Sequence, residues 1–221
     1  MDRRNFTKLA LGGFALTFLS DSIGRAAPSN IPDAKPATPP PVPPMPRAAP
    51  LKPYAALLER AKTALDTHDF ALRDRVAIAD FNAPSRDLRL HVVDLMNGQA
   101  LSYLVAHGRG SDPEHSGWVH RFSNEFESLA SCAGAFRTGE SYFGQHGQAM
   151  RLMGLDPQNC NAEPRAIVVH GADYVTEDHV ATWGKCGRSE GCFAVAPHIV
   201  PQLLGLLGTG RLLYADKVSA A

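Results

Sequence analysis

The 221-residue sequence predicts one mainly β domain with a few helices, an α+β fold. Residues 88–95 alternate apolar and polar side chains, and a second strand-like run, 99–106, follows Asn97-Gly98, a dipeptide typical of tight hairpins. The β-rich run 166–169 ends directly in His170-Gly171. The clearest helical spacing precedes these strands.

Residues 1–26 have the pattern of a secretory signal peptide: a charged head, the apolar run 9–19 and the small-residue site Gly24-Arg25-Ala26. Adjacent arginines followed by Phe and Lys indicate twin-arginine export. The apolar run is well short of the ~20 residues that span a bilayer, so we expect cleavage after Ala26 rather than a retained anchor. The chain is therefore expected in the periplasm or cell wall, with membrane contact only through the export signal.

Residues 27–53 form a linker that holds most of the 17 prolines. Such a run cannot sustain helix or sheet hydrogen bonding and favours an extended polyproline chain. It serves either as a semi-rigid tether for the domain that follows or as a remnant of export.

Residues 54–221, about 170 residues, are enough for one domain with a sizeable core. Helical spacing predicts a helix over 54–66 and a second, short one over 71–79, before the hairpin of 88–106. A glycine-rich middle with little regular pattern leads to the strand that ends at His170. A helix is expected over 194–204, with Pro197 in its first turn, and a last strand over 210–215.

The formal net charge is zero over the whole chain. Removing 1–26 discards four basic and two acidic residues, which leaves about −2. Nucleic-acid binding needs a basic stripe, and the sequence has none, so we expect no nucleic-acid partner.

The most informative motif is Gly191-Cys192, with His170 delivered by a strand end upstream. A free thiol is mostly protonated at neutral pH and needs a base or a positive environment to become a nucleophilic thiolate. His170 is the candidate base. A helix starting close to Cys192 would favour the thiolate through its dipole, and Gly191 would let the backbone approach an acyl group. The pair predicts thiolate acyl transfer, with backbone N–H groups around Gly191 and Cys192 holding the oxyanion.

Beyond this pair, the sequence resembles the L,D-transpeptidase catalytic domain family (YkuD-like), whose signature is His-Gly followed by Ser/Thr-x-Gly-Cys. Its closest likeness is to the divergent bacterial subgroup with Gly-Arg-Ser-x-Gly-Cys. The likeness covers about residues 88–218 and is carried by the segments 106–111, 122–124, 139–144, 146–147, 152–155, 165–175 and 188–192. Glu190 stands where the common motif has His, and the spacing from His170 to Cys192 implies an enlarged loop.

The resemblance implies a β-sandwich-like fold with the cysteine in a groove, no cofactor, and peptidoglycan stem peptides as partners. Cys192 would form a thioester acyl-enzyme with a tetrapeptide stem and transfer it to an amine, giving a 3-3 cross-link. L,D-carboxypeptidase and L,D-endopeptidase activities on the same wall peptides are the alternatives.

Five further residues complete the predicted site. The family pattern implies that a carbonyl at Gly171 orients the His170 ring. Ser189 is a hydrogen-bond donor beside the nucleophile, or only a turn residue. Arg188 binds a substrate carboxylate or forms a structural ion pair, and Tyr142 is either a substrate wall or a core aromatic. His107 is a candidate groove residue, although a plain loop histidine is the safer interpretation; His146 is similar.

The remaining cysteines, Cys132, Cys160 and Cys186, leave the disulfide pairing open. A Cys160–Cys186 bridge is the preferred pairing in an exported protein, and three unpaired thiols are the alternative.

Two rival functions remain. A zinc site would use His170, His179, Cys186, Cys192 and His198, but their spacing matches no zinc motif, so we expect no metal. The other rival is an inactive wall-binding domain.

Overall fold

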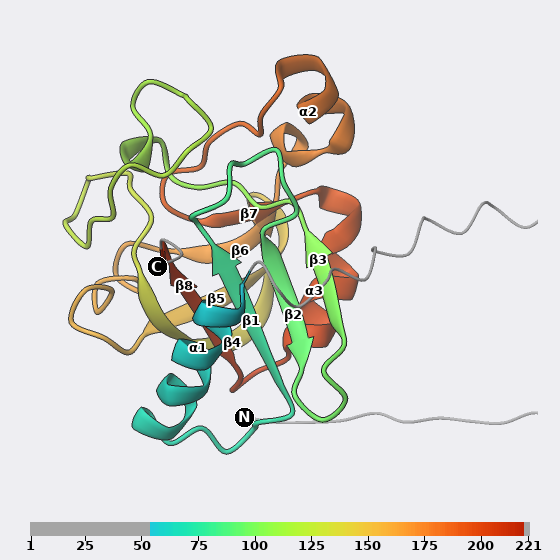
Figure 1. Cartoon of the computed structure of the whole chain (residues 1–221). Helices are drawn as coiled ribbons and strands as arrows, with labels where there is room; N and C mark the ends of the chain where they lie inside the picture. Colours follow the sequence, from blue (N-terminus) through green and yellow to red (C-terminus); the bar gives the residue numbers. More distant parts are fainter. Residues whose placement is uncertain (1–53, 219–221) are drawn as a thin grey trace, which may run out of the picture. The chain divides into compact units, whose positions relative to one another are not determined.

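The computed structural model describes residues 54–218, so the predicted signal peptide, 1–26, and linker, 27–53, lie outside the described residues. The described part is built on one eight-stranded mixed sheet with the order β3-β2-β1-β8-β4-β5-β6-β7 (Figure 1). Neighbouring strands are antiparallel except for the parallel pairs β1–β8 and β6–β7. The strands are β1 (Arg75–Asp80), β2 (Leu90–Asp94), β3 (Ala100–Tyr103), β4 (Gly134–Gly144), β5 (Gly147–Gly154), β6 (Val168–Gly171), β7 (Phe193–Val195) and β8 (Leu212–Asp216).

Three α-helices accompany the sheet: α1 (Ala55–Thr67), α2 (Glu177–Trp183) and α3 (Val200–Leu207). Short 3-10 turns occupy η1 (Arg109–Ser111), η2 (Asp173–Val175) and η3 (Pro197–Ile199). The predicted α+β class with few helices is therefore confirmed. The enlarged loop expected between His170 and Cys192 contains η2 and α2.

The hairpin predicted at Asn97-Gly98 is present as β2 and β3. Asp94 and Gln99 are joined by a backbone hydrogen bond of 2.8 Å, and Gly98 has a φ of +71°, in the left-handed region that glycine adopts without strain. The turn chemistry read from the sequence therefore sets the register of this edge of the sheet.

The helix predicted over 54–66 is α1, which buries Leu57, Ala61 and Leu65 against β1 and β8 (Figure 1). Full burial of a leucine side chain contributes about 1.5–3 kcal/mol, so this apolar face holds the helix on the sheet. The last predicted strand, 210–215, is found as β8.

Two predictions about the first half of the domain are wrong. The segment 71–79 is not a helix, because Arg75–Asp80 is strand β1, paired on both sides by β2 and β8. A strand buried on both faces is a continuous apolar run, and such a run cannot be distinguished from a short helix by periodicity. The glycine-rich middle is regular after all, since it contains the long β4–β5 hairpin.

The single helix predicted over 194–204 is also wrong. Phe193–Val195 forms β7 and pairs with β6, and the chain then passes through η3 before α3 begins at Val200. Tertiary pairing with β6 overrides the local preference here. Cys192 is therefore followed by a strand and not by the N-terminus of a helix.

The two edges of the sheet approach one another. Ala106, just after β3, donates a 2.9 Å backbone hydrogen bond to Ala194 in β7, and the rings of Phe81 and Phe193 stack at 6.0 Å. Residues of all eight strands share one hydrophobic cluster, so distant strands face each other across it, in the sandwich-like arrangement expected. This closure places the segment after β3 beside the loop that carries Cys192.

No helix within residues 54–218 is both long and apolar enough to cross a bilayer.

Candidate active site

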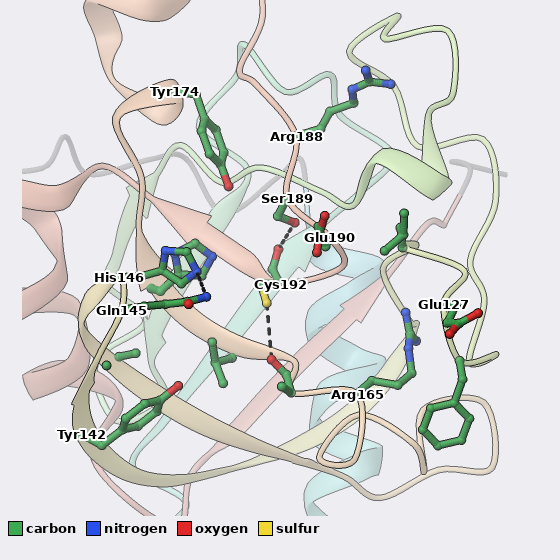
Figure 2. Close-up of a pocket in the computed structure, with 17 residues that line it drawn as sticks. Glu127, Tyr142, Gln145, His146, Arg165, Tyr174, Arg188, Ser189, Glu190 and Cys192 are labelled. Carbon is green, nitrogen blue, oxygen red and sulfur yellow. Dashed lines mark hydrogen bonds between the residues drawn. The ribbon is translucent and has the colours of Figure 1, made fainter.

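Pairing of β6 with β7 brings Cys192 and His170 to one face of the sheet. His170 pairs with Ala194 in these parallel strands, and Cys192 lies two residues before Ala194. Side chains two residues apart on an extended strand point to the same face. Both residues line a cavity of about 860 Å³, shown in Figure 2.

His170 is a neutral imidazole with one free nitrogen. Its Nδ1 lies 2.9 Å from the carbonyl oxygen of Gly171, which can only accept, so Nδ1 carries the proton and Nε2 keeps its lone pair. The His170 side chain is buried, and this burial lowers its pKa, an effect opposed by the Gly171 carbonyl and reinforced by His146. The ring is therefore ready to accept a proton at neutral pH.

Cys192 is a thiol in this structure. Its Sγ lies 3.5 Å from the carbonyl oxygen of Ala166 (Figure 2), and burial raises the thiol pKa above its ordinary value of 9.0, with a further upward contribution from Glu190. The helix dipole expected to favour a thiolate is absent at this position because β7 follows. Deprotonation must therefore depend on a base such as His170.

Gly191 is required by the protein's own packing. Its φ is +116°, and a Cβ there would lie 2.7 Å from Cδ1 of Ile167 and 2.8 Å from the carbonyl oxygen of Ala130. Glycine is therefore needed here for a steric reason within the fold, while the approach of an acyl group to it stays a prediction. Its conformation turns the chain sharply just before Cys192.

Ser189 holds that turn. Its buried hydroxyl donates a 2.7 Å hydrogen bond to the carbonyl of Cys192 (Figure 2). The same hydroxyl accepts a hydrogen bond of 3.2 Å from the N–H of Gly191. The Gly191 N–H, expected to bind an oxyanion, is therefore already occupied. The N–H of Cys192 makes no hydrogen bond within residues 54–218, which leaves it as the donor beside the thiol.

Arg188 and Tyr142 both line the cavity, in different ways. The Arg188 guanidinium donates to the carbonyls of Asp112 and Pro113 and points away from Cys192 in Figure 2. Within residues 54–218 it forms no ion pair, and its binding of a substrate carboxylate stays a prediction. Tyr142, on β4, lies under the guanidinium of Arg151 at 4.7 Å and forms part of the cavity wall. Of the two interpretations of Tyr142, a wall residue or a core aromatic, the structure supports the wall residue.

His107 is not a groove residue. It is buried, its Nδ1 lies 2.7 Å from the guanidinium of Arg89, and its Nε2 lies 3.2 Å from the carboxylate of Asp112. A guanidinium only donates and a carboxylate accepts, so the imidazole is neutral with its proton on Nε2. We therefore correct the predicted substrate contact to a buried structural network.

Two buried histidines, His107 in this network and His91 in β2, predict that acid destabilises the fold. Burial lowers the pKa of His107 to about 3 and that of His91 to about 4, against 6.5 for an exposed histidine. Below pH 6.5 each of these histidines binds a proton in the unfolded chain but not in the folded chain. The free energy of unfolding therefore falls by about 1.4 kcal/mol per pH unit for each histidine. Urea unfolding should show a loss of about 2–4 kcal/mol between pH 7 and pH 5.

The exposed His198 supplies the control for this prediction. His198→Ala should leave the pH dependence of the urea midpoint unchanged. Equal urea midpoints at pH 7 and pH 5 in the unsubstituted protein would contradict the buried neutral state of the two histidines.

Several lining residues were not singled out from the sequence. Arg165 donates to the carbonyls of Ser123 (2.8 Å) and Ala130 (2.6 Å) and so holds the cavity wall that carries Phe126 and Glu127. Arg165 is far in the sequence from the residues that it holds, so no local sequence pattern indicates this wall. Tyr174 contributes a phenol whose burial raises its pKa to about 12.

Glu190, which replaces the family's usual His, lies at the exposed rim. Its carboxylate pairs with Arg109 at 2.7 Å, and both side chains are more than half exposed. An exposed pair of this kind contributes little to stability. Its carboxylate instead adds negative charge near Cys192, which opposes thiolate formation.

The preferred disulfide is absent, since all four cysteines are free. Cys186 is buried and donates to the carbonyl of Ser85, whereas Cys160 is exposed beside Asn124. Among residues 54–218, no group of three or more His, Cys, Asp or Glu side chains is placed to hold a metal ion.

Comparison with solved structures finds 31 similar chains. An L,D-transpeptidase from Mycobacterium smegmatis has a TM-score of 0.41 and 12% identity, covering 65% of this chain and 58% of that one. An L,D-transpeptidase from Stackebrandtia nassauensis has a TM-score of 0.38 and 14% identity, covering 66% of this chain and 57% of that one. The helical cell-shape-determining protein Pgp2 from Campylobacter jejuni has a TM-score of 0.42 and 11% identity, covering 68% of this chain and 49% of that one. This chain thus spans about half to three fifths of those chains.

A search of curated proteins finds no match. A family model, by contrast, covers nearly the whole described domain: the L,D-transpeptidase catalytic domain matches residues 51–215, which include His170, Gly191 and Cys192. Because the match takes in most of the 221 residues and the cavity residues together, the chain belongs to the L,D-transpeptidase catalytic domain family.

Proposed function

We propose that this protein is a cysteine-dependent peptidoglycan L,D-transpeptidase that makes 3-3 cross-links. The observation that carries the proposal is the cavity that holds both the Cys192 thiol and a neutral His170 with a free Nε2. A thiol and a base that face one cavity are the groups that nucleophilic acyl transfer needs.

In acylation, the Cys192 Sγ attacks the carbonyl carbon of the L-centre residue that precedes the terminal D-alanine of a tetrapeptide stem. The thiol proton passes to Nε2 of His170, and the carbonyl oxygen becomes an oxyanion facing the N–H of Cys192. The C–N bond then breaks, and D-alanine leaves with the proton from His170. The product is a thioester on Cys192.

In transfer, an amine of a second stem attacks the thioester carbonyl and His170 takes the proton that the amine loses. The C–S bond breaks, the proton returns to sulfur, and an amide remains. In each half-reaction His170 therefore accepts one proton and donates one, while its Nδ1–H stays hydrogen-bonded to the carbonyl of Gly171.

A second cavity of about 760 Å³ favours transfer to an amine over hydrolysis. Among the residues that the structure describes, only His146, His170 and Tyr174 line both cavities, so the base lies in the wall between them. The second cavity carries the carboxylate of Asp173 among apolar residues such as Pro197 and Val200, and a carboxylate attracts an ammonium group. Water in place of the amine would give L,D-carboxypeptidase activity.

The setting of this reaction is proposed from the N-terminal pattern. Twin-arginine export, with cleavage after Ala26, would deliver the folded domain to the periplasm or cell wall, where peptidoglycan lies. Membrane contact would then be limited to the export signal.

Intact-mass spectrometry tests the proposed function. The protein incubated with tetrapeptide muropeptides should gain the mass of the stem less D-alanine, and adding an amine acceptor should release a cross-linked 3-3 product. Turnover with only tripeptide release would select carboxypeptidase activity. Binding to sacculi without any adduct would favour the inactive wall-binding domain, and stoichiometric zinc with chelator-sensitive activity would favour a zinc site.

A further inference from the structure

His146 lies directly against the candidate base, although the two residues are far apart in the sequence. It occupies the second position of the two-residue turn Gln145-His146 that joins β4 to β5, where Gly144 pairs with Gly147. Its ring stacks on that of His170, with centroids 4.6 Å apart and planes at 28°. Both rings line both cavities.

We propose that His146 is a positioning residue for His170: its stacked ring holds the plane of the base. This inference rests on the proposed function and adds to it a residue that the thiol–imidazole pair does not include. His146 touches His170 and acts through it.

The His146 ring restricts the orientation of the His170 ring. The His170 ring makes one hydrogen bond, to the carbonyl of its own neighbour Gly171. A single bond at Nδ1 fixes one edge of the ring and leaves the ring free to tilt about that edge. The stacked face of His146 blocks the tilt of the His170 ring toward one side and so keeps Nε2 in the wall that the two cavities share.

The His146 ring also acts on the charge of the base. Its electrostatic contribution lowers the pKa of His170 in the same direction as burial, which favours the neutral form that accepts the thiol proton. The ring is placed for this by the stack on His170 and by the side-chain amide nitrogen of Gln145, which lies 3.0 Å from Nε2 of His146 (Figure 2).

Other charged and titratable groups share this environment and bear on any pH dependence. Those that line the two cavities with His146 are Glu127, Tyr142, Arg165, Asp173, Tyr174, Arg188, Glu190 and Cys192. These groups include both acidic and basic side chains. Within residues 54–218, only the His146 ring stacks on the His170 ring.

The test compares two substitutions of His146 with one matched control. His146→Phe keeps an aromatic face and removes the ring nitrogens, His146→Ala removes both, and Glu140→Ala changes an exposed residue of the same hairpin that lines neither cavity. The acylation rate by tetrapeptide is measured by intact mass from pH 5 to pH 9, and the His170 tautomer by nitrogen NMR of the ring.

We expect His146→Ala to lower the acylation rate constant about 2- to 10-fold at pH 7, the equivalent of one lost aromatic contact, with substrate affinity little changed, and to mix the two His170 tautomers. His146→Phe should restore the rate and the single Nδ1–H tautomer. In both variants the acid limb should lie at higher pH than in the unsubstituted protein, because the contribution of His146 that lowers the His170 pKa is gone. Glu140→Ala should match the unsubstituted protein in all three measurements.

Two results would overturn the inference: an unchanged rate and tautomer in His146→Ala, or equal losses in the Ala and Phe variants with no change in the pH profile. Failure of the proposed function looks different. The unsubstituted protein would then form no adduct, while the tautomer measurement would still decide whether His146 positions the ring.

Discussion

Cys192→Ala should abolish thioester formation and turnover while leaving the fold intact. Removing the nucleophile of a covalent mechanism lowers turnover by roughly 10⁶-fold, because the catalytic residues act as a unit. No adduct mass should appear with tetrapeptide stems. The side chain lies partly exposed in a cavity, so its loss leaves no large void in the core and the urea midpoint should change little.

The matched control is Cys160→Ala, which removes an exposed thiol that contacts Asn124 and does not line the cavity with Cys192. This variant should acylate at the rate of the unsubstituted protein. Retained turnover in Cys192→Ala, or adduct mass mapped to another cysteine, would exclude Cys192 as the nucleophile.

His170→Ala should lower the acylation rate by roughly 10²- to 10⁴-fold at pH 7, the usual contribution of a general base. The loss should shrink as pH rises, because hydroxide then generates the thiolate without the base. Burial raises the Cys192 pKa above its ordinary 9.0, so the recovery should continue beyond pH 9. Stopped-flow or timed mass measurements from pH 5 to pH 10 give the profile.

The unsubstituted protein should behave differently on the acid side. Burial lowers the His170 pKa below the ordinary 6.5, so the neutral base persists, and the rate should hold, at pH values where an exposed histidine would already be charged. His198→Ala, at an exposed histidine outside both of the cavities that His170 lines, is the control and should keep this profile. If the profile of His170→Ala has the same shape as that of the unsubstituted protein, another group is the base.

How far the fold could be predicted depended on whether its signals were local. The Asn97-Gly98 turn and the apolar face of α1 are encoded within a few residues and were predicted correctly. β1 and β7 were predicted as helices because their partners, β8 and β6, come from elsewhere in the chain. Pairing across the sheet outweighed local preference in both segments.

The candidate site divides in the same way. His170 and the Gly191-Cys192 pair stand out from their neighbours in the sequence, whereas the wall held by Arg165 does not. His107 and His146 looked alike as histidines before glycine, yet one is enclosed by Arg89 and Asp112 and the other stacks on His170. Nothing local separates them, since the difference lies in which distant side chains surround each ring.

The sequence by itself therefore determined the kinds of group available, a thiol, an imidazole and a glycine turn, and the family to which their pattern belongs. Only the tertiary structure decided their state: a protonated Cys192, a neutral His170 and a Gly191 enclosed by Ile167 and Ala130. The reason is that residue type sets what chemistry is possible, whereas burial and neighbouring charge, which arise from segments distant in the chain, set protonation and orientation.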